Sequence, residues 1–175
     1  MNIILFIVIL MTTCNAAALQ AEKVVITADE MQYQTKENIS IAKGNARAES
    51  GEGALKKILV GDTLIGHFQP QTDGSTSNSE VTQSKLIKIE AKGNVVLTKG
   101  DTLIQADHCI HDIEKESAIC STTPGNVVKI THLNHQLRGH KIEIDLKKEQ
   151  YCLLPDSTMK KPRVMALIST DKKSQ

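Results

Sequence analysis

Apolar and charged residues alternate with a period of two along much of this chain, and this alternation constrains its fold more than any other feature. The clearest case is KIEIDL at residues 141–146, and KIEAK at residues 88–92 repeats it. A period of two places one face of a strand in a core and the other in water, whereas a helix needs a period near 3.6. The sequence therefore predicts an all-β protein built from half-buried strands.

Glycine-containing dipeptides separate the alternating runs, and such pairs are typical of turns. The longest polar stretch, residues 69–79, predicts an exposed loop, and a length of 175 residues fits a single domain. The dipeptides at which we expect turns are Gly44-Asn45, Gly61-Asp62, Gly93-Asn94, Gly100-Asp101 and Gly125-Asn126.

One sequence unit recurs along the chain. It reads ITADEMQY at 26–33, IQADHCIH at 104–111 and LRGHKIEI at 137–144, with LIGHF at 64–68 as a shortened copy. A charged turn, a return strand and a Gly-Asn corner complete the unit. Small residues at one shared place predict a bend, or close sheet packing that excludes larger side chains: Ala28, Gly66, Ala106 and Gly139. Stacked hairpins of this kind form a long twisted roll whose ends are open sheet edges.

The N-terminus predicts export. Residues 2–11 form an uncharged apolar run, and an Ala-rich segment with an A-x-A-like site follows it. The run is shorter than the ~20 apolar residues that a membrane-spanning helix needs, which favours a cleaved leader. No Lys or Arg precedes it, so an uncleaved anchor and a lipoprotein attached through Cys14 stay open as alternatives. We expect residues 1–18 to be a cleaved signal peptide and residues 19–175 to be the exported domain.

Composition and motifs exclude several functions. Lys plus Arg number 21 and Asp plus Glu number 20, which leaves no broad basic surface for nucleic acid. With two Phe, two Tyr and no Trp, the chain has no aromatic platform for bases, and its core must be aliphatic. The sequence contains neither a G-x-S-x-G elbow nor a Gly-rich phosphate loop. We therefore expect no catalysis, no cofactor and no nucleic-acid binding.

A metal site is also not expected. Two H-x-x-H motifs, at 108–111 and 132–135, would direct their histidines to opposite faces if each pair lay on one strand. Asp107, Cys109 and His111 would share a face and are the best metal candidates. Ordinary side chains on a sheet are the simpler interpretation of these three residues.

The spacing of two cysteines suggests a cross-strand pair. Residues 105–121 predict a hairpin that turns at Glu114, by alignment with the first repeat, and this sets Cys109 opposite Cys120. Opposed residues of antiparallel strands have Cα atoms about 4.5–5.5 Å apart, which suits a disulfide. A disulfide and two free thiols are both open at this point, and Cys152 is free in either case.

The order I-x-A-D-x-x-x-Y, turn, A-x-G-N-V, strand resembles the OstA-like domain of the lipopolysaccharide-transport proteins, over residues 24–168. The resemblance implies an open, twisted β-jellyroll with a hydrophobic groove, which carries lipopolysaccharide from the inner to the outer membrane without catalysis. Length, leader and a single domain copy are similar to the periplasmic bridge of that family. Implied partners are the lipid A acyl chains, inner- and outer-membrane transport components joined by edge-strand pairing, and head-to-tail copies of the chain itself.

Aliphatic side chains without specific polar groups suit acyl chains. The residues that we expect to line the groove lie on the apolar side of the repeated strands: Ile26, Met31, Tyr33, Ile104, Ile142 and Ile144. A sealed core without a ligand is the alternative for each of them. For the whole chain, the alternatives are a membrane-anchored component of the same pathway and an exported structural or carbohydrate-binding β-repeat protein.

Overall fold

The computed structural model describes residues 23–69, 85–155 and 163–168, and the signal peptide and nearly all of the polar loop predicted above lie outside these ranges. Within them, no helix is long and apolar enough to cross a membrane. The described residues form these elements: β1 (Val24–Thr27), β2 (Glu30–Gln34), β3 (Ile39–Ser50), the short 3-10 helix η1 (Gly53–Leu55), β4 (Lys57–Phe68), β5 (Leu86–Lys99), β6 (Thr102–Asp112), β7 (Ser117–Ser121), β8 (Val128–His132), β9 (His135–Gly139), β10 (Lys141–Asp145), β11 (Gln150–Leu154) and β12 (Met165–Leu167).

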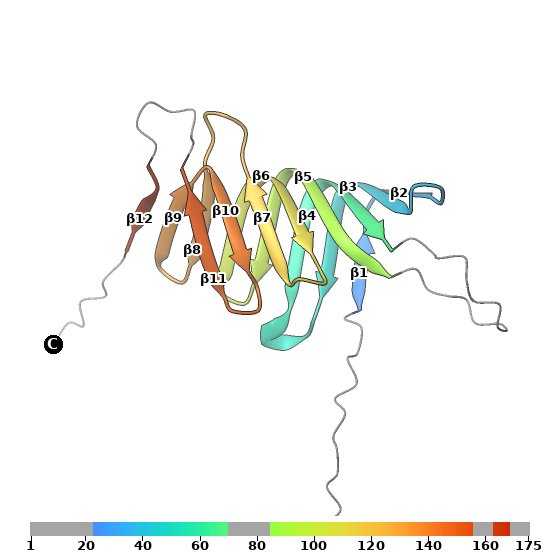
Figure 1. The fold of residues 1–175 in the computed structure, drawn as a ribbon, viewed down its shortest axis with the longest axis horizontal. Helices are drawn as coiled ribbons and strands as arrows, with labels where there is room; N and C mark the ends of the chain where they lie inside the picture. The colour runs from blue at the N-terminus through green and yellow to red at the C-terminus, as the bar shows by residue number, and fades with distance from the viewer. Residues whose placement is uncertain (1–22, 70–84, 156–162, 169–175) are drawn as a thin grey trace, which may run out of the picture.

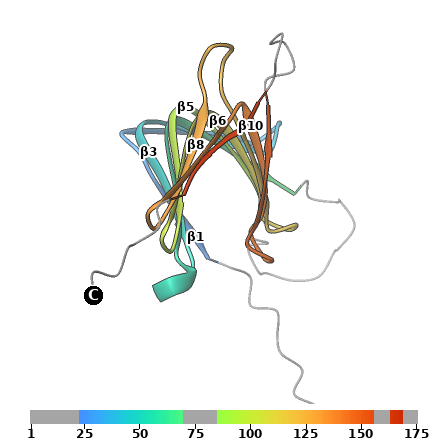
Figure 2. The same cartoon turned by 90° about the vertical axis from the view of Figure 1, so that its left-hand side faces the viewer.

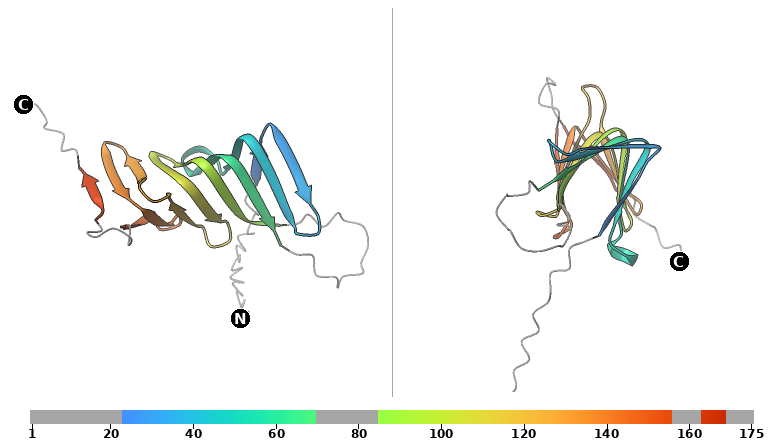
Figure 3. Two further views of the ribbon diagram at one scale, coloured as in Figure 1. Left: turned by 90° about the horizontal axis from the view of Figure 1, so that it is seen from above. Right: turned by 90° about the vertical axis from the view of Figure 1, so that its right-hand side faces the viewer.

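All described strands belong to one antiparallel sheet. Its main path runs β1-β3-β4-β5-β6-β7-β10-β11, while β2 pairs with β3, β8 joins β6 to β9, and β12 pairs with β9. β1 and β2 lie at one end of the roll and β12 lies at the other (Figure 1), and Figure 3 shows the same order from above. The chain is therefore an all-β, open, twisted β-jellyroll of antiparallel hairpins, as predicted.

The sheet folds into two leaves because its long strands bend near their middles. Seen along the roll, the leaves diverge from the bends and leave one side open between their free ends (Figure 2). The first leaf contains the short strands β1, β8, β9 and β12. It also contains one half of each long strand: the C-terminal halves of β3 and β5 and the N-terminal halves of β4 and β6. The second leaf contains β2, β7, β10, β11 and the other halves of the same four long strands.

The bends lie where turns were expected. Gly44-Asn45 and Gly93-Asn94 do not end strands; they lie within β3 and β5, with positive φ at both residues of each pair. The register shifts beside each pair, and Gly61-Asp62 is the matching point within β4. A bulge that adds residues to one strand bends and twists it. The prediction of turns at these three sites was wrong, whereas Gly100-Asp101 is a turn.

Gly66 fits the alternative of close sheet packing and not that of a bend, so the shortened repeat copy was misaligned with the bends of the other copies. It lies in a regular stretch of β4 opposite Ser40 and Ile89. A Cβ at Gly66 would come within 2.7 Å of the Ser40 hydroxyl oxygen, which explains the absence of a side chain there. The small residue at the bend of β4 is Gly61.

An aspartate holds each of three bends: Asp29 lies between β1 and β2, whereas Asp62 and Asp107 lie on β4 and β6. The Asn45 side-chain amide donates to Asp29 at 2.8 Å, and the Asn94 amide donates to Asp62 at 3.0 Å. At the third bend, the Asp107 carboxylate accepts hydrogen bonds from Asn126 and from both the backbone N–H and the hydroxyl of Thr123. The A-D and G-N elements of the repeat are therefore two halves of one contact.

The hairpin of β6 and β7 has the predicted register, with Cys109 opposite Cys120. The two cysteines form a disulfide, with Cα atoms 4.1 Å apart, and Cys152 is free and exposed. The expectation that Asp107 shares a face with Cys109 and His111 was wrong. Cys109 lies three residues from Ala106, yet both are buried, because the bend between them interrupts the alternation. Asp107 instead bonds the third bend.

Candidate functional site

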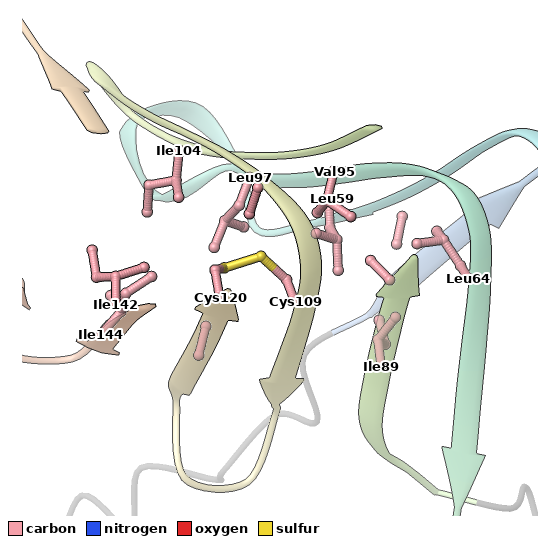
Figure 4. Close-up of a cluster of buried hydrophobic side chains, with 14 of the residues drawn as sticks. Leu59, Leu64, Ile89, Val95, Leu97, Ile104, Cys109, Cys120, Ile142 and Ile144 are labelled. Atoms are coloured by element: carbon pink, nitrogen blue, oxygen red, sulfur yellow. A yellow bond between two sulfur atoms is a disulfide. The ribbon is translucent and has the colours of Figure 1, made fainter. Parts of the chain in front are cut away.

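The inner faces of the two leaves meet in an aliphatic core. The register aligns inward-facing residues into rows that cross the strands, and Figure 4 shows side chains from both leaves pointing toward one another around the disulfide. On the second leaf, the row nearest the bends consists of Ala42, Leu64, Ala91, Cys109, Cys120, Ile142 and Leu153. On the first leaf, the facing row consists of Ala48, Leu59, Leu97, Ile104, Ile130 and Leu137.

Three of the six predicted groove residues lie in this core. Ile104, Ile142 and Ile144 are buried, and they come from both leaves. Burial on this scale stabilises the fold, at about 25 cal/mol for each Å² of apolar surface removed from water. In this structure these side chains belong to one buried cluster, so an occupant would have to come in from the open side.

The other three predicted residues lie at the N-terminal end of the roll. Ile26 on β1 is partly buried against the core. Met31 and Tyr33 are opposite the inward-facing Ala42 and Ser40, so they present their side chains on the inner face. They are nevertheless 55 % and 49 % exposed, because β2 is an edge strand with no neighbour beyond it among the described residues.

A cavity of about 580 Å³ opens between the leaves toward the C-terminal end. Its apolar walls include Ile130 and Leu137 of the first leaf and the ring of Tyr151 of the second. Sequence reasoning missed all three residues, because the cavity brings together residues of different leaves that are far apart in the chain, and local alternation does not show which of them meet. A concave apolar site with a few polar groups is the usual form of a ligand pocket.

Polar contacts cross the open side beside this cavity and join the leaves. The Tyr151 hydroxyl on β11 donates to Thr102 Oγ1 on β6 at 3.3 Å, and Thr102 Oγ1 is 2.8 Å from His132 Nδ1. The Lys99 ammonium of the first leaf donates to the Leu146 carbonyl oxygen at 2.6 Å and to Glu149 at 3.0 Å. We call these contacts the polar bridge.

The second H-x-x-H motif has a different geometry from the one expected. β8 ends at His132 and β9 begins at His135, so the two histidines face each other across a hairpin. The assumption that both lie on one strand was wrong for this pair. Within the described ranges, no group of three or more His, Cys, Asp or Glu side chains is arranged to hold a metal ion.

The outer face of the second leaf carries an ion-pair cluster. Glu90 accepts from His108 at 2.7 Å and from Lys92 at 3.1 Å. Burial raises the pKa of Glu90, but the hydrogen bonds from His108 and Lys92 outweigh it, and the pKa lies below its ordinary value. Burial and the charge of Lys88 lower the pKa of the neighbouring His67. This cluster lies on the face opposite the groove and stabilises neighbouring strands.

Neither a protein-family model nor a curated protein matches this sequence. Among solved structures, the chain is similar to LptH of Pseudomonas aeruginosa, described as the LptA homologous periplasmic component of the conserved lipopolysaccharide transport device. The TM-score is 0.67 at 12 % sequence identity, and the match covers 85 % of this chain and 96 % of that chain. The chain therefore has an LptA-like fold, as the OstA-like repeat order implied.

Proposed function

We propose that this protein is a non-enzymatic periplasmic carrier that holds lipopolysaccharide acyl chains between its leaves and carries the lipid from the inner to the outer membrane. The observation that carries this proposal is the aliphatic interior, which is open along one side and ends in a cavity lined by Ile130, Leu137 and Tyr151. Each acyl CH₂ that leaves water contributes about 0.8 kcal/mol. A lipid with several chains therefore gains enough free energy to separate the side chains that are packed together in the interior.

The two ends of the sheet suit assembly into a bridge. Met165 and Leu167 on β12 are exposed, and β12 pairs with β9 alone among the described strands. Unpaired strand edges accept another strand. We propose head-to-tail pairing between copies, and pairing of the terminal copies with transport components of the inner and outer membranes.

Two alternative functions can be distinguished from the proposed carrier by measurement. A membrane-anchored component of the pathway would keep residues 1–18, and the mass of the mature protein distinguishes it from a cleaved periplasmic carrier. An exported carbohydrate-binding or structural β-repeat protein would have a closed interior and would contain no co-purifying lipid.

Photo-crosslinking in living cells tests the proposal. A photoreactive amino acid at Met31 or Leu137 would face the groove, and the matched controls at Gln32 and Arg138 are the adjacent positions on the outer face of the same strands. We expect lipopolysaccharide adducts at Met31 and Leu137 and none at Gln32 and Arg138. Equal labelling of both faces, or no lipid adduct at either inward position, would contradict the proposal.

A further inference from the structure

One margin of the groove is polar. Six inward-facing residues lie at the ends of the first-leaf strands, along the open side. They come from β3, β4, β5, β6, β8 and β9, and each is directly opposite the next one across the sheet. Residues paired in this way present their side chains on the same face of a sheet. We call this row the polar rim, and it consists of Ser50, Lys57, Lys99, Thr102, His132 and His135.

The opposite margin of the groove is apolar. Leu86, Ile113 and Leu146 of the second leaf pack against the core there. One row deeper than the polar rim, the first leaf is aliphatic, with Leu59 and Leu97 as examples. On the first leaf, the inward-facing side chains thus change from aliphatic to cationic between two neighbouring rows, from Leu59 and Leu97 to Lys57 and Lys99. This order matches the order of tail and head in an amphiphile.

Two lysines at the centre of the rim carry the inference. Lys57 and Lys99 are directly opposite each other on β4 and β5. Lys57 is only 9 % exposed, and the Lys99 side chain is only 12 % exposed. Like charges directly opposite in a sheet destabilise it, and withdrawal from water adds to that cost. Glu149 already pairs with Lys99 at 3.0 Å, and an anion that contacted both ammonium groups would add to this compensation.

Hydrogen-bond donors remain for such an anion. An ammonium has three N–H donors, and within the described ranges those of Lys99 bond two acceptors, Leu146 O and Glu149 Oε1. The buried Nδ1 of His135, further along the rim, has no hydrogen-bond partner in the described part of the chain. Lys99 lines both the 580 Å³ cavity and a larger one of about 1410 Å³, so it lies where the two meet.

The charges around the larger cavity favour an anion. Lys56, one of the lysines there, is already paired with Glu49 at 2.7 Å. The described charged residues that line this cavity are Lys23, Lys56, Lys57, Lys99, Lys147, Glu49, Glu52 and Glu116, five cations against three carboxylates.

We propose that Lys57 and Lys99 bind the phosphate of a lipid head group whose acyl chains lie in the groove. This inference rests on the proposed function and adds the head-group chemistry to it. Phosphate accepts charge-assisted hydrogen bonds from lysine ammonium groups. The neighbouring Thr102, His132 and His135 supply polar contacts for the rest of the head group.

Two lipids that differ only in the phosphate test the proposal. Fluorescent phosphatidic acid and fluorescent diacylglycerol with identical acyl chains are titrated with the full chain, and binding is followed by anisotropy. We expect the phosphate to tighten binding about ten-fold, as a pair of charge-assisted hydrogen bonds implies. Lys57→Gln should remove most of this preference and leave diacylglycerol binding unchanged. Lys99→Gln should also remove the preference, but it breaks the polar bridge, so its diacylglycerol binding is expected to change as well. The control Lys129→Gln changes an exposed outer-face lysine of the same leaf and should behave as wild type.

Three results of these titrations would overturn the head-group proposal. Equal binding of the two lipids by the wild-type protein, or binding of neither, overturns the head-group proposal. The carrier proposal is decided separately, by the crosslinking of lipopolysaccharide described above. Because Lys99→Gln also removes the contact to Leu146, Lys57→Gln is the deciding variant, and an unchanged phosphate preference in it would overturn the assignment. Displacement of phosphatidic acid by an equal concentration of inorganic phosphate would show a site for free phosphate, which also overturns it.

Discussion

Lys99 and Leu146 belong to opposite leaves, yet the Lys99 ammonium nitrogen lies 2.6 Å from the Leu146 carbonyl oxygen. Together with the Tyr151 hydroxyl on Thr102, this contact ties the leaves across the open side of an otherwise unclosed sheet. The polar bridge therefore opposes separation of the two leaves at the C-terminal half of the roll.

Removal of the Tyr151 hydroxyl should weaken this tie without disturbing the packing. We expect Tyr151→Phe to lower the free energy of unfolding by about 1 kcal/mol, because it removes one hydrogen bond and keeps the ring. Urea denaturation measures the change. The control Tyr33→Phe alters a half-exposed ring at the end of the roll and should have a smaller effect. Equal losses in the two variants would contradict a bridging role for Tyr151.

The disulfide should be present in protein taken from its native compartment. With thiols blocked at lysis, peptide mapping should recover Cys109 linked to Cys120 and only Cys152 alkylated. The bond joins residues 11 apart, and a short loop of this kind stabilises by about 2–3 kcal/mol. We therefore expect the double variant Cys109→Ala, Cys120→Ala to unfold at lower urea. Alkylation of both cysteines in the native protein would refute the bond.

The bends require glycine for two separable reasons. Gly93 and Gly125 both have positive φ, but only at Gly93 would an added Cβ overlap a neighbouring group, the Asp62 carboxylate. A residue with a Cβ at positive φ costs about 1–3 kcal/mol. Gly125→Ala should show that cost alone, and Gly93→Ala should cost more. Thermal unfolding of both variants checks the order, and an equal loss would show that the Asp62 contact is unimportant.

Acid should weaken the third bend. The backbone N–H of Thr123, then its hydroxyl, then Asn126 stabilise the Asp107 carboxylate and hold its pKa below the ordinary 3.8. A lowered pKa stabilises the fold above the ordinary value, and that contribution is lost as pH falls through the lowered value. At pH 7 the free energy of unfolding should therefore be larger for the wild-type protein than for Asp107→Asn. Below about pH 4 the difference between the two proteins should become small. A difference that does not depend on pH would argue against this assignment.

The C-terminal edge should control self-association. Deletion of residues 163–175 removes β12, whereas deletion of 169–175 keeps it. If copies pair through this edge, the first deletion should abolish concentration-dependent oligomers and the second should retain them. Sedimentation velocity over a wide concentration range measures both. A wild-type protein that stays monomeric throughout would refute edge pairing.

Local patterns were sufficient for the strands and for one cross-strand pair. Alternation has a period of two on any half-buried strand, so it predicts β-structure wherever the strand lies. The hairpin around Glu114 depends on residues close in the chain, and Cys109 is opposite Cys120 as the spacing predicted. The repeated A-D and G-N pairs were also visible, but their contact was not, because Asp62 and Asn94 are 32 residues apart.

Tertiary structure decided which side chains form the site. Alternation places Met31 and Ile142 on the same kind of face, yet Met31 is exposed and Ile142 is buried, because Met31 lies on an edge strand and Ile142 lies between β7 and β11. Lys57 and Lys99 become neighbours only through the register of β4 and β5. The sequence by itself therefore determined the strands, their repeat and the aliphatic interior. The bends, the open side and the polar rim depend on contacts between residues far apart in the chain, which no local period encodes.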